Sequence, residues 1–416
     1  MSRIRVCLAS TALVAAAVLA VTAGTLSAMA PQKSDDQVVV QVTDLVSDLS
    51  ILVDTFGIVH HPFVLDPNLV NPWGVAESTG SPFWVADNNR GVSTLYNDTA
   101  NTPVTIAPLV VSIPGPKDPL NPTGTPTGAV FNTATAAQQF KISGFDRNGV
   151  AASAPALFMF ATEDGTIVGW NPGVNPPGFD INKAGSYGII AVDNSTNPTA
   201  ADGAVYKGLA IATDAAGKTL LYATNFRAGT VEVYDTSFHR VSLSAGAFTD
   251  RHLPHDYAPF NIVLSGGRLF VTYAKQDREK HDDVAGPGHG IVNTFDLSGQ
   301  TMKRFAQHGH LDSPWGVVQA PGTFGQFAGA VLIGNFGNGR IHAFDADTGR
   351  FLGPVVNSIG QTILIDGLWS LIVGNGKAGG DAGTVYFSAG PNGEKDGLFG
   401  SLRPVPLGTP CGVPCR

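Results

Sequence analysis

A six-fold internal repeat runs through most of this 416-residue chain and constrains its fold more than any other feature. Each repeat opens with an apolar residue or Pro, then Trp, Thr, Lys or Phe, then a small residue that starts an apolar stretch. The small residues are spaced by 54, 80, 53, 55 and 54 positions: Gly74, Gly128, Gly208, Asn261, Gly316 and Ser370. Five units also carry a Gly followed five residues later by an aromatic residue, and Gly397 and Leu402 keep that spacing in the sixth. Self-similarity at such a period indicates a repeat architecture.

Each unit contains several short apolar stretches separated by turn residues, such as Asp164-Gly165 in the second unit. The chain has 50 Gly and 28 Pro, about 19% of its residues against roughly 12% in average proteins. This composition favours short strands and many turns over long helices. Units of this length with four strands each predict an all-β fold, a six-bladed β-propeller with four-stranded blades. Two stacked β-sandwiches are the alternative, but they leave the six-fold register unexplained.

The two ends of the repeat region are predicted to meet. Residues 38–46 form an apolar stretch before the first unit, and the sixth unit lacks a clear fourth strand. We therefore expect this N-terminal strand to close the last blade. The second unit has extra residues around 132–156 and 171–187, both predicted as surface loops because they are rich in Gly, Pro, Ala and Asn. No linker divides the chain, so residues 31–405 are predicted to form one domain.

The first thirty residues are predicted to be a signal peptide rather than part of the fold. Arg3 and Arg5 precede an Ala-rich apolar run that ends in Ala-Met-Ala at positions 28–30, a signal-peptidase site. An uncleaved N-terminal anchor is the alternative. No later stretch reaches the length of a membrane-spanning helix. The mature chain is therefore predicted to be secreted or periplasmic, with no membrane span.

Cysteine usage agrees with export. Cys7 leaves with the signal peptide, and Cys411 and Cys415 remain in the C-terminal tail 406–416, separated by Gly-Val-Pro. In an oxidising compartment these two residues are predicted to form a disulfide. A redox or metal-binding pair is the alternative, but the spacing is not Cys-x-x-Cys and no second pair exists.

The charge balance limits the partners. The chain has 25 Lys and Arg against 33 Asp and Glu, a net charge of −8, which becomes −10 when Arg3 and Arg5 leave with the signal peptide. An acidic protein is a poor partner for nucleic acid or for an anionic membrane surface. We expect a monomer whose partner is an extracellular protein, a glycan or a small molecule.

Several motifs are similar to those of a known bacterial family: Asn71-Pro-Trp-Gly-Val-Ala, Phe83-Trp-Val-Ala-Asp-Asn, Phe160-Ala-Thr-Glu-Asp-Gly-Thr, Tyr273-Ala-Lys-Gln-Asp, Lys280-His-Asp-Asp-Val and Gly397-Leu-Phe-Gly-Ser-Leu. The chain resembles, over about residues 40–405, a family of exported proteins of unknown function predicted to be NHL-like six-bladed propellers. The resemblance implies fold and export but no activity, so no catalytic residue is transferred. Some members carry a C-terminal sorting anchor, whereas this tail ends without a hydrophobic helix, which favours free release.

Polar residues gather on one predicted face. In a propeller, the loop entering the first strand of a blade and the loop between its second and third strands open on the same side, and eight of the ten His fall on such loops. Turn preferences alone also favour Asn and Asp in these loops. The residues predicted to bind a ligand there are Asn88, Glu163, Lys275, Asp277, His281, His308, His310, Asn335 and Trp369.

The loop 275–290 is the densest polar stretch and suggests a metal site. Asp282 and Asp283 are predicted as carboxylate ligands, with Asp366 or Glu394 reaching in from the sixth blade. Carboxylates with imidazoles suit Ca²⁺ or a transition metal. A solvated loop of mixed charge is the alternative, since the spacing matches no specific metal motif. A divalent cation such as Ca²⁺ is the one cofactor that the sequence suggests.

Trp73, Trp315 and Trp369 recur at one position of the repeat. They are predicted to pack beside the channel, with a sugar-stacking platform as the alternative. No nucleophile elbow and no His-Glu-x-x-His motif is present.

Two functions follow from the sequence. The favoured one is a non-catalytic, exported scaffold that binds a ligand or a protein through one loop face. The alternative is a metal-dependent, lactonase-like hydrolase with a divalent ion at the channel mouth, by analogy of fold alone. Binding needs only an exposed patch, whereas the hydrolase needs several ligand atoms to converge on one point.

Overall fold

The computed structural model describes residues 38–99, 102–180, 186–199 and 201–407. All of them belong to one compact unit, Asp35–Arg416. The predicted signal peptide and the predicted disulfide between Cys411 and Cys415 lie outside the described residues, so both stay predictions. Within these ranges no helix has the length and apolar character needed to cross a membrane.

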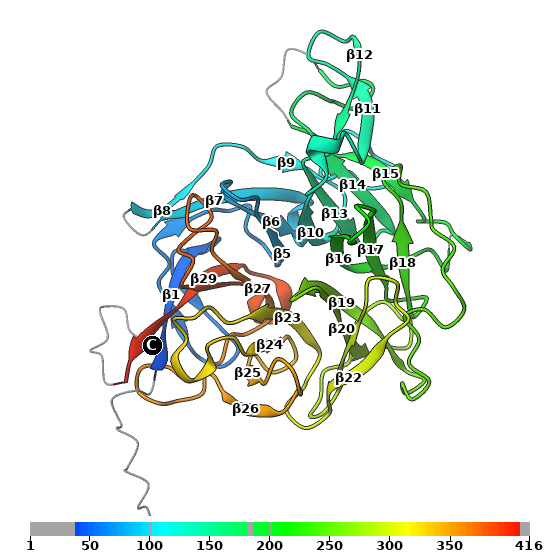
Figure 1. Cartoon of the computed structure of the whole chain (residues 1–416). Coiled ribbons are helices and arrows are strands. Elements are labelled where there is room, and N and C mark those ends of the chain that lie inside the picture. Colours follow the sequence, from blue (N-terminus) through cyan, green and yellow to red (C-terminus); the bar gives the residue numbers. More distant parts are fainter. Residues whose placement is uncertain (1–37, 100–101, 181–185, 200, 408–416) are drawn as a thin grey trace, which may run out of the picture. The chain divides into compact units, whose positions relative to one another are not determined.

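The described strands form six blades of antiparallel sheet, in chain order (Figure 1). Blade 1 contains β5 (Pro72–Ala76), β6 (Phe83–Asp87), β7 (Val92–Thr99), β8 (Thr102–Ile106) and the short β9 (Val111–Ser112). Blade 2 contains β10 (Pro126–Phe131), β13 (Phe158–Thr162), β14 (Thr166–Trp170) and β15 (Ile189–Asp193), and blade 3 contains β16 (Tyr206–Thr213), β17 (Thr219–Asn225) and β18 (Thr230–Tyr234). Blade 4 contains β19 (Tyr257–Ser265), β20 (Arg268–Lys275), β21 (Gly290–Phe295) and β22 (Met302–Gln307). Blade 5 contains β23 (Pro314–Gln319), β24 (Val331–Asn335), β25 (Ile341–Phe344) and β26 (Phe351–Pro354), and blade 6 contains β27 (Leu368–Val373), β28 (Val385–Ala389), β29 (Leu398–Pro406) and β1 (Val38–Ser47).

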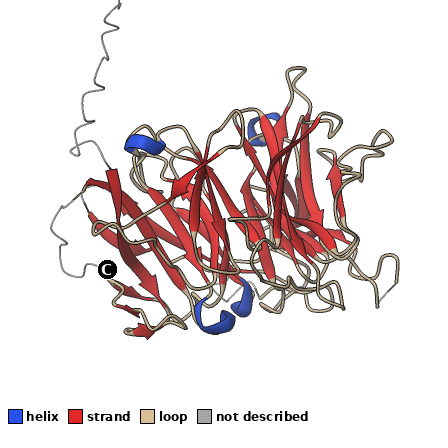
Figure 2. Cartoon of the chain, turned by 90° about the horizontal axis from the view of Figure 1, so that it is seen from below, coloured by secondary structure: helices blue, strands red, loops and turns tan. Residues whose placement is uncertain are grey.

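The first strand of each blade lies innermost. Neighbouring inner strands contact one another in chain order, and β27 contacts β5, so the blades close a ring. Figure 1 shows these strands grouped around a common centre, and the view turned by 90° shows strands running between two opposite faces that carry the loops (Figure 2). The predicted six-bladed β-propeller is confirmed.

β1 completes the sixth blade, as predicted for residues 38–46. It pairs antiparallel with β29 from Val38–Pro406 to Ser47–Leu398. Its side chains Val39, Val40, Leu45 and Val46 are buried in the blade, with Val46 wholly inaccessible to solvent. The ring is therefore closed by noncovalent pairing between strands from opposite ends of the chain.

Blade 3 has three named strands, and blade 2 carries an extra hairpin beside its four strands. In blade 3 the fourth position is held only by residues 239–241, where the Val241 N–H donates to the Val233 carbonyl at 2.7 Å. In blade 2 the first insertion is not the surface loop that its composition predicted, because it contains a hairpin of β11 (Lys141–Phe145) and β12 (Ala151–Pro155). A tight turn joins the two strands: the Asp146 carboxylate accepts hydrogen bonds from the backbone of Asn148 and Val150.

Short elements decorate the loops. They are β2 (Leu52–Val53), β3 (Val59–His60), β4 (Val64–Leu65), the 3₁₀ turns η2 (Asn88–Arg90), η3 (Thr135–Ala137) and η4 (Gly325–Phe327), and the single-turn α1 (Pro391–Glu394). η2 and α1 lie between the second and third strands of blades 1 and 6, and β2 and β3 form a hairpin in the connection from β1 to blade 1.

The small residue of the repeat has a steric cause. A Cβ added to Gly74 would lie 2.3 Å from the Thr127 carbonyl oxygen, and one added to Gly128 would lie 2.5 Å from the Leu209 nitrogen. Real Cβ atoms do not approach backbone that closely. The glycines at this position thus let adjacent inner strands meet backbone to backbone, whereas the fourth and sixth repeats have Asn261 and Ser370 there.

Candidate functional site

Aromatic side chains fill the centre of the ring beside the face that carries the loops between the second and third strands of each blade. Trp73 and Trp369 stack with ring centroids 3.6 Å apart, and Trp315 meets Trp369 edge-on at 5.9 Å. Phe336 stacks on Trp369 at 3.9 Å, and all three Trp are at most 3% exposed. Because these rings pack against one another, the predicted core-packing role of the Trp residues holds, and they offer no open face for stacking a sugar. We call this group, with Phe226 and Phe260, the aromatic cluster.

A buried ammonium lies over this cluster. Lys207 occupies in the third repeat the position that Trp73 holds in the first, and its Nζ lies 4.8 Å from the centroid of the Trp73 ring. It is 1% exposed, pairs with Glu163 Oε1 and lies 3.4 Å from Asp282 Oδ1. Burial alone would lower the pKa of Lys207, but the two carboxylates outweigh it and hold that pKa above its usual value. The side chain is therefore charged.

Loops from several blades bring polar groups around Lys207. We define the mouth as Asn71, Asn88, Glu163, Lys207, His281, Asp282, Asp283 and Glu394. Glu163 follows β13, and its Oε2 accepts a hydrogen bond from Asn88 Nδ2 at 2.9 Å. Glu394 ends α1, and its Oε2 accepts one from Asn71 Nδ2 at 2.8 Å. The mouth is thus built by blades 1, 2, 3, 4 and 6.

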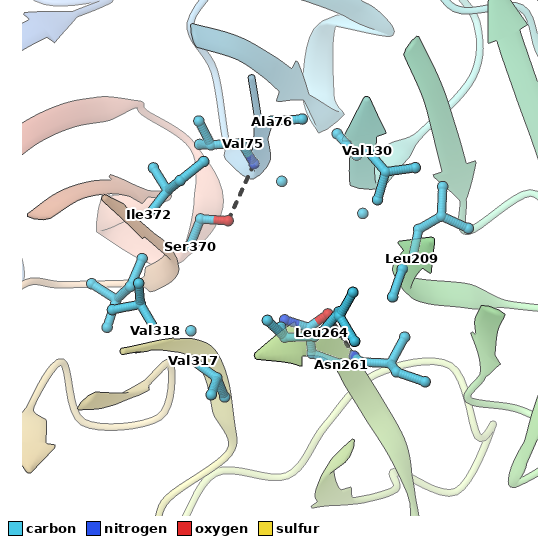
Figure 3. Close-up of a pocket in the computed structure, with 18 of the residues that line it drawn as sticks. Val75, Ala76, Val130, Leu209, Asn261, Leu264, Val317, Val318, Ser370 and Ile372 are labelled. Carbon is cyan, nitrogen blue, oxygen red and sulfur yellow. Dashed lines mark hydrogen bonds between the residues drawn. The ribbon is translucent and has the colours of Figure 1, made fainter. Parts of the chain in front are cut away.

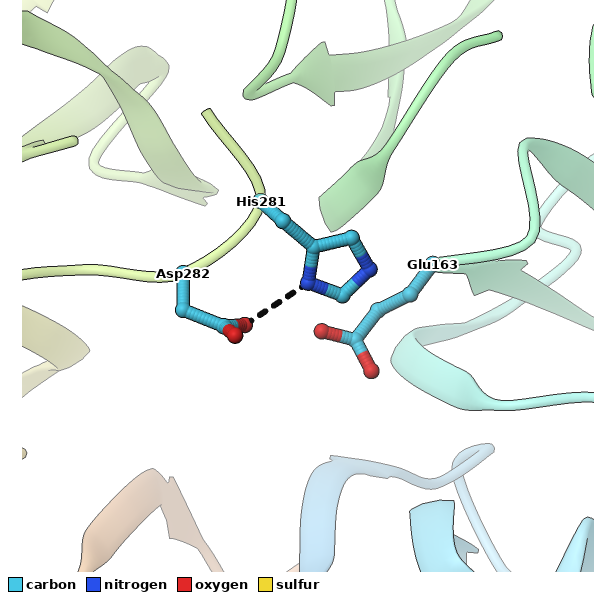
Figure 4. A group of neighbouring side chains, drawn as sticks. All are labelled: Glu163, His281 and Asp282. Carbon is cyan, nitrogen blue, oxygen red and sulfur yellow. Dashed lines mark hydrogen bonds and ion pairs between the residues drawn. The ribbon is translucent and has the colours of Figure 1, made fainter. Parts of the chain in front are cut away.

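Three residues of the mouth form a compact group of metal-ligand types (Figure 4). One ligand atom from each of Glu163, His281 and Asp282 lies within 4.8 Å of the others. His281 Nδ1 lies 2.9 Å from Asp282 Oδ1. This hydrogen bond raises the pKa of His281 and lowers the pKa of Asp282 to about 2. The hydrogen bond therefore favours the charged form of each side chain.

The surroundings of two further carboxyls of the mouth disfavour their ionised forms. Burial raises the pKa of Asp283 to about 6, and one of its oxygens, Oδ2, has no hydrogen-bond partner among the described residues. Burial, followed by the charge of Glu163, raises the pKa of Glu394 to about 7. Like charges in a partly desolvated site repel one another. The mouth therefore holds more acid than Lys207 and His281 neutralise.

Other predicted site residues serve local structure instead of the mouth. Lys275 Nζ lies 3.5 Å from Asp256, Asp277 Oδ1 accepts the His281 N–H, and His308 Nδ1 lies 3.0 Å from the Gly288 oxygen. His310 stacks on Phe351 at 3.7 Å, Asn335 accepts the Asp312 N–H and donates to the His310 carbonyl, and Asp366 accepts the N–H groups of Thr55 and Asn392. Sequence reasoning brought Asn88, Glu163, His281, Asp282, Asp283 and Glu394 to the mouth and Trp369 to its floor.

Sequence reasoning missed Lys207 and Asn71. The signal for Lys207 was present, because a lysine replaces an aromatic residue at a repeat position that points to the centre of the ring. Asn71 precedes the first repeat motif, and its Oδ1 accepts a hydrogen bond from Trp369 Nε1 at 3.0 Å. No pattern in the sequence marks that contact between residues 298 positions apart.

On the other side of the aromatic cluster, the inner strands enclose a cavity of about 400 Å³. Trp315 lines it, and Figure 3 shows side chains from every blade around it, among them Val75, Val130, Leu209 and Val318. Glu77 is the one acid in its lining, and burial raises the pKa of this carboxyl to about 8. Converging charged groups are found at the mouth and not in this cavity.

Comparison with known proteins gives relatives but no activity. No model of a known protein family matches the chain. It is 30% identical over 345 residues to the uncharacterised protein R648 of Acanthamoeba polyphaga mimivirus, covering 81% of this chain and 76% of that protein. It is 32% identical over 342 residues to the uncharacterised protein L690 of the same virus, covering 81% of each. These relatives are viral, so the resemblance to an exported bacterial family stays an expectation.

Solved structures are similar only at a distance. A streptogramin B lyase is 10% identical with a TM-score of 0.43, covering 90% of this chain and 100% of that one. A protein of unknown function from Bacteroides thetaiotaomicron is 10% identical with a TM-score of 0.48, covering 89% and 77%. At these scores the likeness says nothing about the chemistry of the mouth.

Proposed function

Because this chain belongs to the family of the uncharacterised mimivirus proteins R648 and L690, which assign it no activity, we propose its function from the residues of the mouth. In this proposal the protein is an exported scaffold that binds a cationic group of its ligand. The group is a primary amine or a guanidinium. The observation that supports this is the surplus of carboxylates around the buried ammonium of Lys207.

The charges of the mouth favour a cation. Both oxygens of Glu163 already accept hydrogen bonds, one from Lys207 and one from Asn88. Oδ1 of Asp282 lies next to Lys207 and His281. Acceptor capacity remains on Glu394 and on Asp282, whose side chain is 66% exposed, whereas the unpaired Oδ2 of Asp283 is buried and contributes only its charge. An incoming ammonium or guanidinium would donate charge-assisted hydrogen bonds to these oxygens and relieve the repulsion between the carboxylates.

Lys207 organises this arrangement. Its ammonium holds Glu163 and Asp282, which come from blades 2 and 4, at fixed positions over the aromatic cluster. Asn71 holds Glu394 through its own hydrogen bond, so the acceptors are preorganised before a ligand arrives, which lowers the entropic cost of binding.

The alternative function is a metal-dependent hydrolase. The group of Glu163, His281 and Asp282 favours it, because carboxylate and imidazole are metal ligands. Against it stands Lys207, whose ammonium already pairs with two of the three carboxylate or imidazole groups. A metal would have to displace this buried cation.

Titration calorimetry of the mature protein with butylammonium at pH 8 tests the proposed function. We expect saturable binding to the wild type and a loss of about tenfold in affinity for Glu394→Gln. The variant keeps an oxygen that can accept the Asn71 hydrogen bond and removes only the charge.

The matched control is Glu279→Gln, an exposed acid on the same loop as Asp282. This control should bind butylammonium as the wild type does. An equal loss of affinity in both variants would show that binding depends on the overall charge of the protein and not on the mouth. No binding to the wild type would refute the proposal. Saturable binding of Ca²⁺ without binding of the amine would favour the hydrolase.

A further inference from the structure

A short stretch beside the mouth exposes an unusual number of large apolar side chains. Of fourteen such exposed residues among the described ones, seven lie within residues 49–65: Leu49, Ile51, Val53, Phe56, Val59, Phe63 and Leu65, at 39 to 61% exposure. Single exposed apolar residues are ordinary, but a gathering of this kind marks an interaction surface. We call residues 49–65 the apolar hairpin.

The hairpin is inverted relative to the usual pattern. β2 and β3 pair Leu52 with His60 and Val53 with Val59, so Val53 and Val59 share one face. That face is turned to solvent, with Val53 53% and Val59 40% exposed, while Leu52 and His60 are buried. Antiparallel sheets that cover a core normally turn polar residues outward.

Buried polar groups hold the hairpin in this orientation. His60 lies between two buried carboxylates, with Nδ1 3.0 Å from Asp44 Oδ1 and Nε2 3.3 Å from Asp54 Oδ2. Turning the hairpin over would bring its apolar face inward but would separate His60 from Asp44 of β1. The outward apolar face is therefore a fixed feature of the fold.

The hairpin borders the mouth. The Thr55 N–H donates to Asp366 Oδ2 at 3.1 Å, and Asn392 Nδ2 donates to the Val53 carbonyl at 3.0 Å. Asn392 belongs to α1, the turn that also carries Glu394. An apolar surface and an acidic mouth are thus joined through one turn of the sixth blade.

We propose that the apolar hairpin and the mouth form one surface for a protein segment that carries apolar side chains next to a Lys or Arg. The inference rests on the proposed function, because the basic side chain would enter the mouth. The apolar side chains would cover Val53, Val59 and their exposed neighbours. Seven large side chains present more surface than a small amine could cover.

Charge selects this occupant over two others. A second copy of the chain would bring another acidic surface, since the mature chain carries a predicted net charge of −10. An anionic membrane surface would be repelled by the carboxylates of the mouth. A basic and apolar segment complements both parts of the surface.

Selection from a random dodecapeptide display library on the mature protein tests the inference. We expect selected peptides to combine aromatic or aliphatic residues with Lys or Arg. Their affinity should fall about tenfold for Val53→Thr/Val59→Thr and also for Glu394→Gln. Val→Thr keeps shape and β-propensity, so the hairpin should stay folded. Val150→Thr, at a 61% exposed position in the blade 2 insertion, is the matched control and should bind as the wild type does.

The arms of the experiment separate the two proposals. The Val53→Thr/Val59→Thr variant should lose the peptides but keep butylammonium, which shows that the mouth is intact. Absence of enriched peptides, equal affinity for that variant, or peptides without basic residues would overturn the inference and leave the proposed function to its own test. Binding of the wild type to phosphatidylglycerol vesicles, lost in the same variant, would also overturn it, in favour of a membrane surface.

Discussion

Lys207 and Trp73 occupy the same position in two repeats, and the ammonium of one lies 4.8 Å from the ring centroid of the other. The ring of blades places both side chains at its centre. An aromatic residue there closes the channel, whereas a lysine there gathers carboxylates from neighbouring blades. This one difference between the repeats places a buried charge and its carboxylate partners beside an otherwise apolar core.

Replacing Lys207 by Met should destabilise the protein by about 3 kcal/mol, because Glu163 would lose the partner of its partly buried charge. Chemical denaturation of the purified variant measures this. Lys218→Met, at an exposed turn, is the control and should be near neutral. The double variant Lys207→Met/Glu163→Gln should recover part of the loss. A neutral Lys207→Met would show that the buried pair does not organise the mouth.

The affinity of the mouth for butylammonium should rise with pH. Asp283 and Glu394, with pKa values raised to about 6 and about 7, become charged as the pH increases from 5 to 8. His281, whose pKa is raised by Asp282, loses its positive charge in the same direction. Butylammonium stays protonated throughout, as a lysine side chain does. Calorimetry at pH 5 and pH 8 should differ by about tenfold or more, and a flat profile would contradict the assigned acceptors.

The metal alternative has its own variant. If a divalent ion binds at the mouth, Asp282→Asn/Asp283→Asn should abolish ion-dependent thermal stabilisation without changing the fold. Differential scanning calorimetry with and without Ca²⁺ measures this, and far-UV circular dichroism checks the fold. Equal stabilisation of wild type and variant would place the ion elsewhere.

Closure of the ring by β1 should dominate stability. Deleting residues 31–48 removes a strand that pairs along the whole of β29 and leaves an open sheet edge. The melting temperature should fall by many degrees, and the truncated protein should aggregate in light scattering. An unchanged melt after the N-terminal deletion would mean that β1 adds nothing to the ring.

The fold could be predicted because its cause is repeated. The glycines at this position, such as Gly74 and Gly128, mark close backbone contacts between inner strands, and Asn261 and Ser370 keep the same spacing in the other two repeats. The site could be predicted only in part, since the sequence does not distinguish a carboxylate or amide that serves the backbone, as Asp366 and Asn335 do, from one that faces the mouth. The apolar hairpin left no periodic signal, because its exposure depends on buried contacts of His60.

A crystal structure of the mature protein soaked with 4-bromobenzylamine shows directly whether the mouth binds an amine, because the bromine locates the ligand by anomalous scattering. We expect the amine nitrogen within hydrogen-bond distance of Asp282 or Glu394, with Lys207 still paired to Glu163. Bromine signal only outside the mouth, or an amine that displaces Lys207 from Glu163, would contradict this expectation.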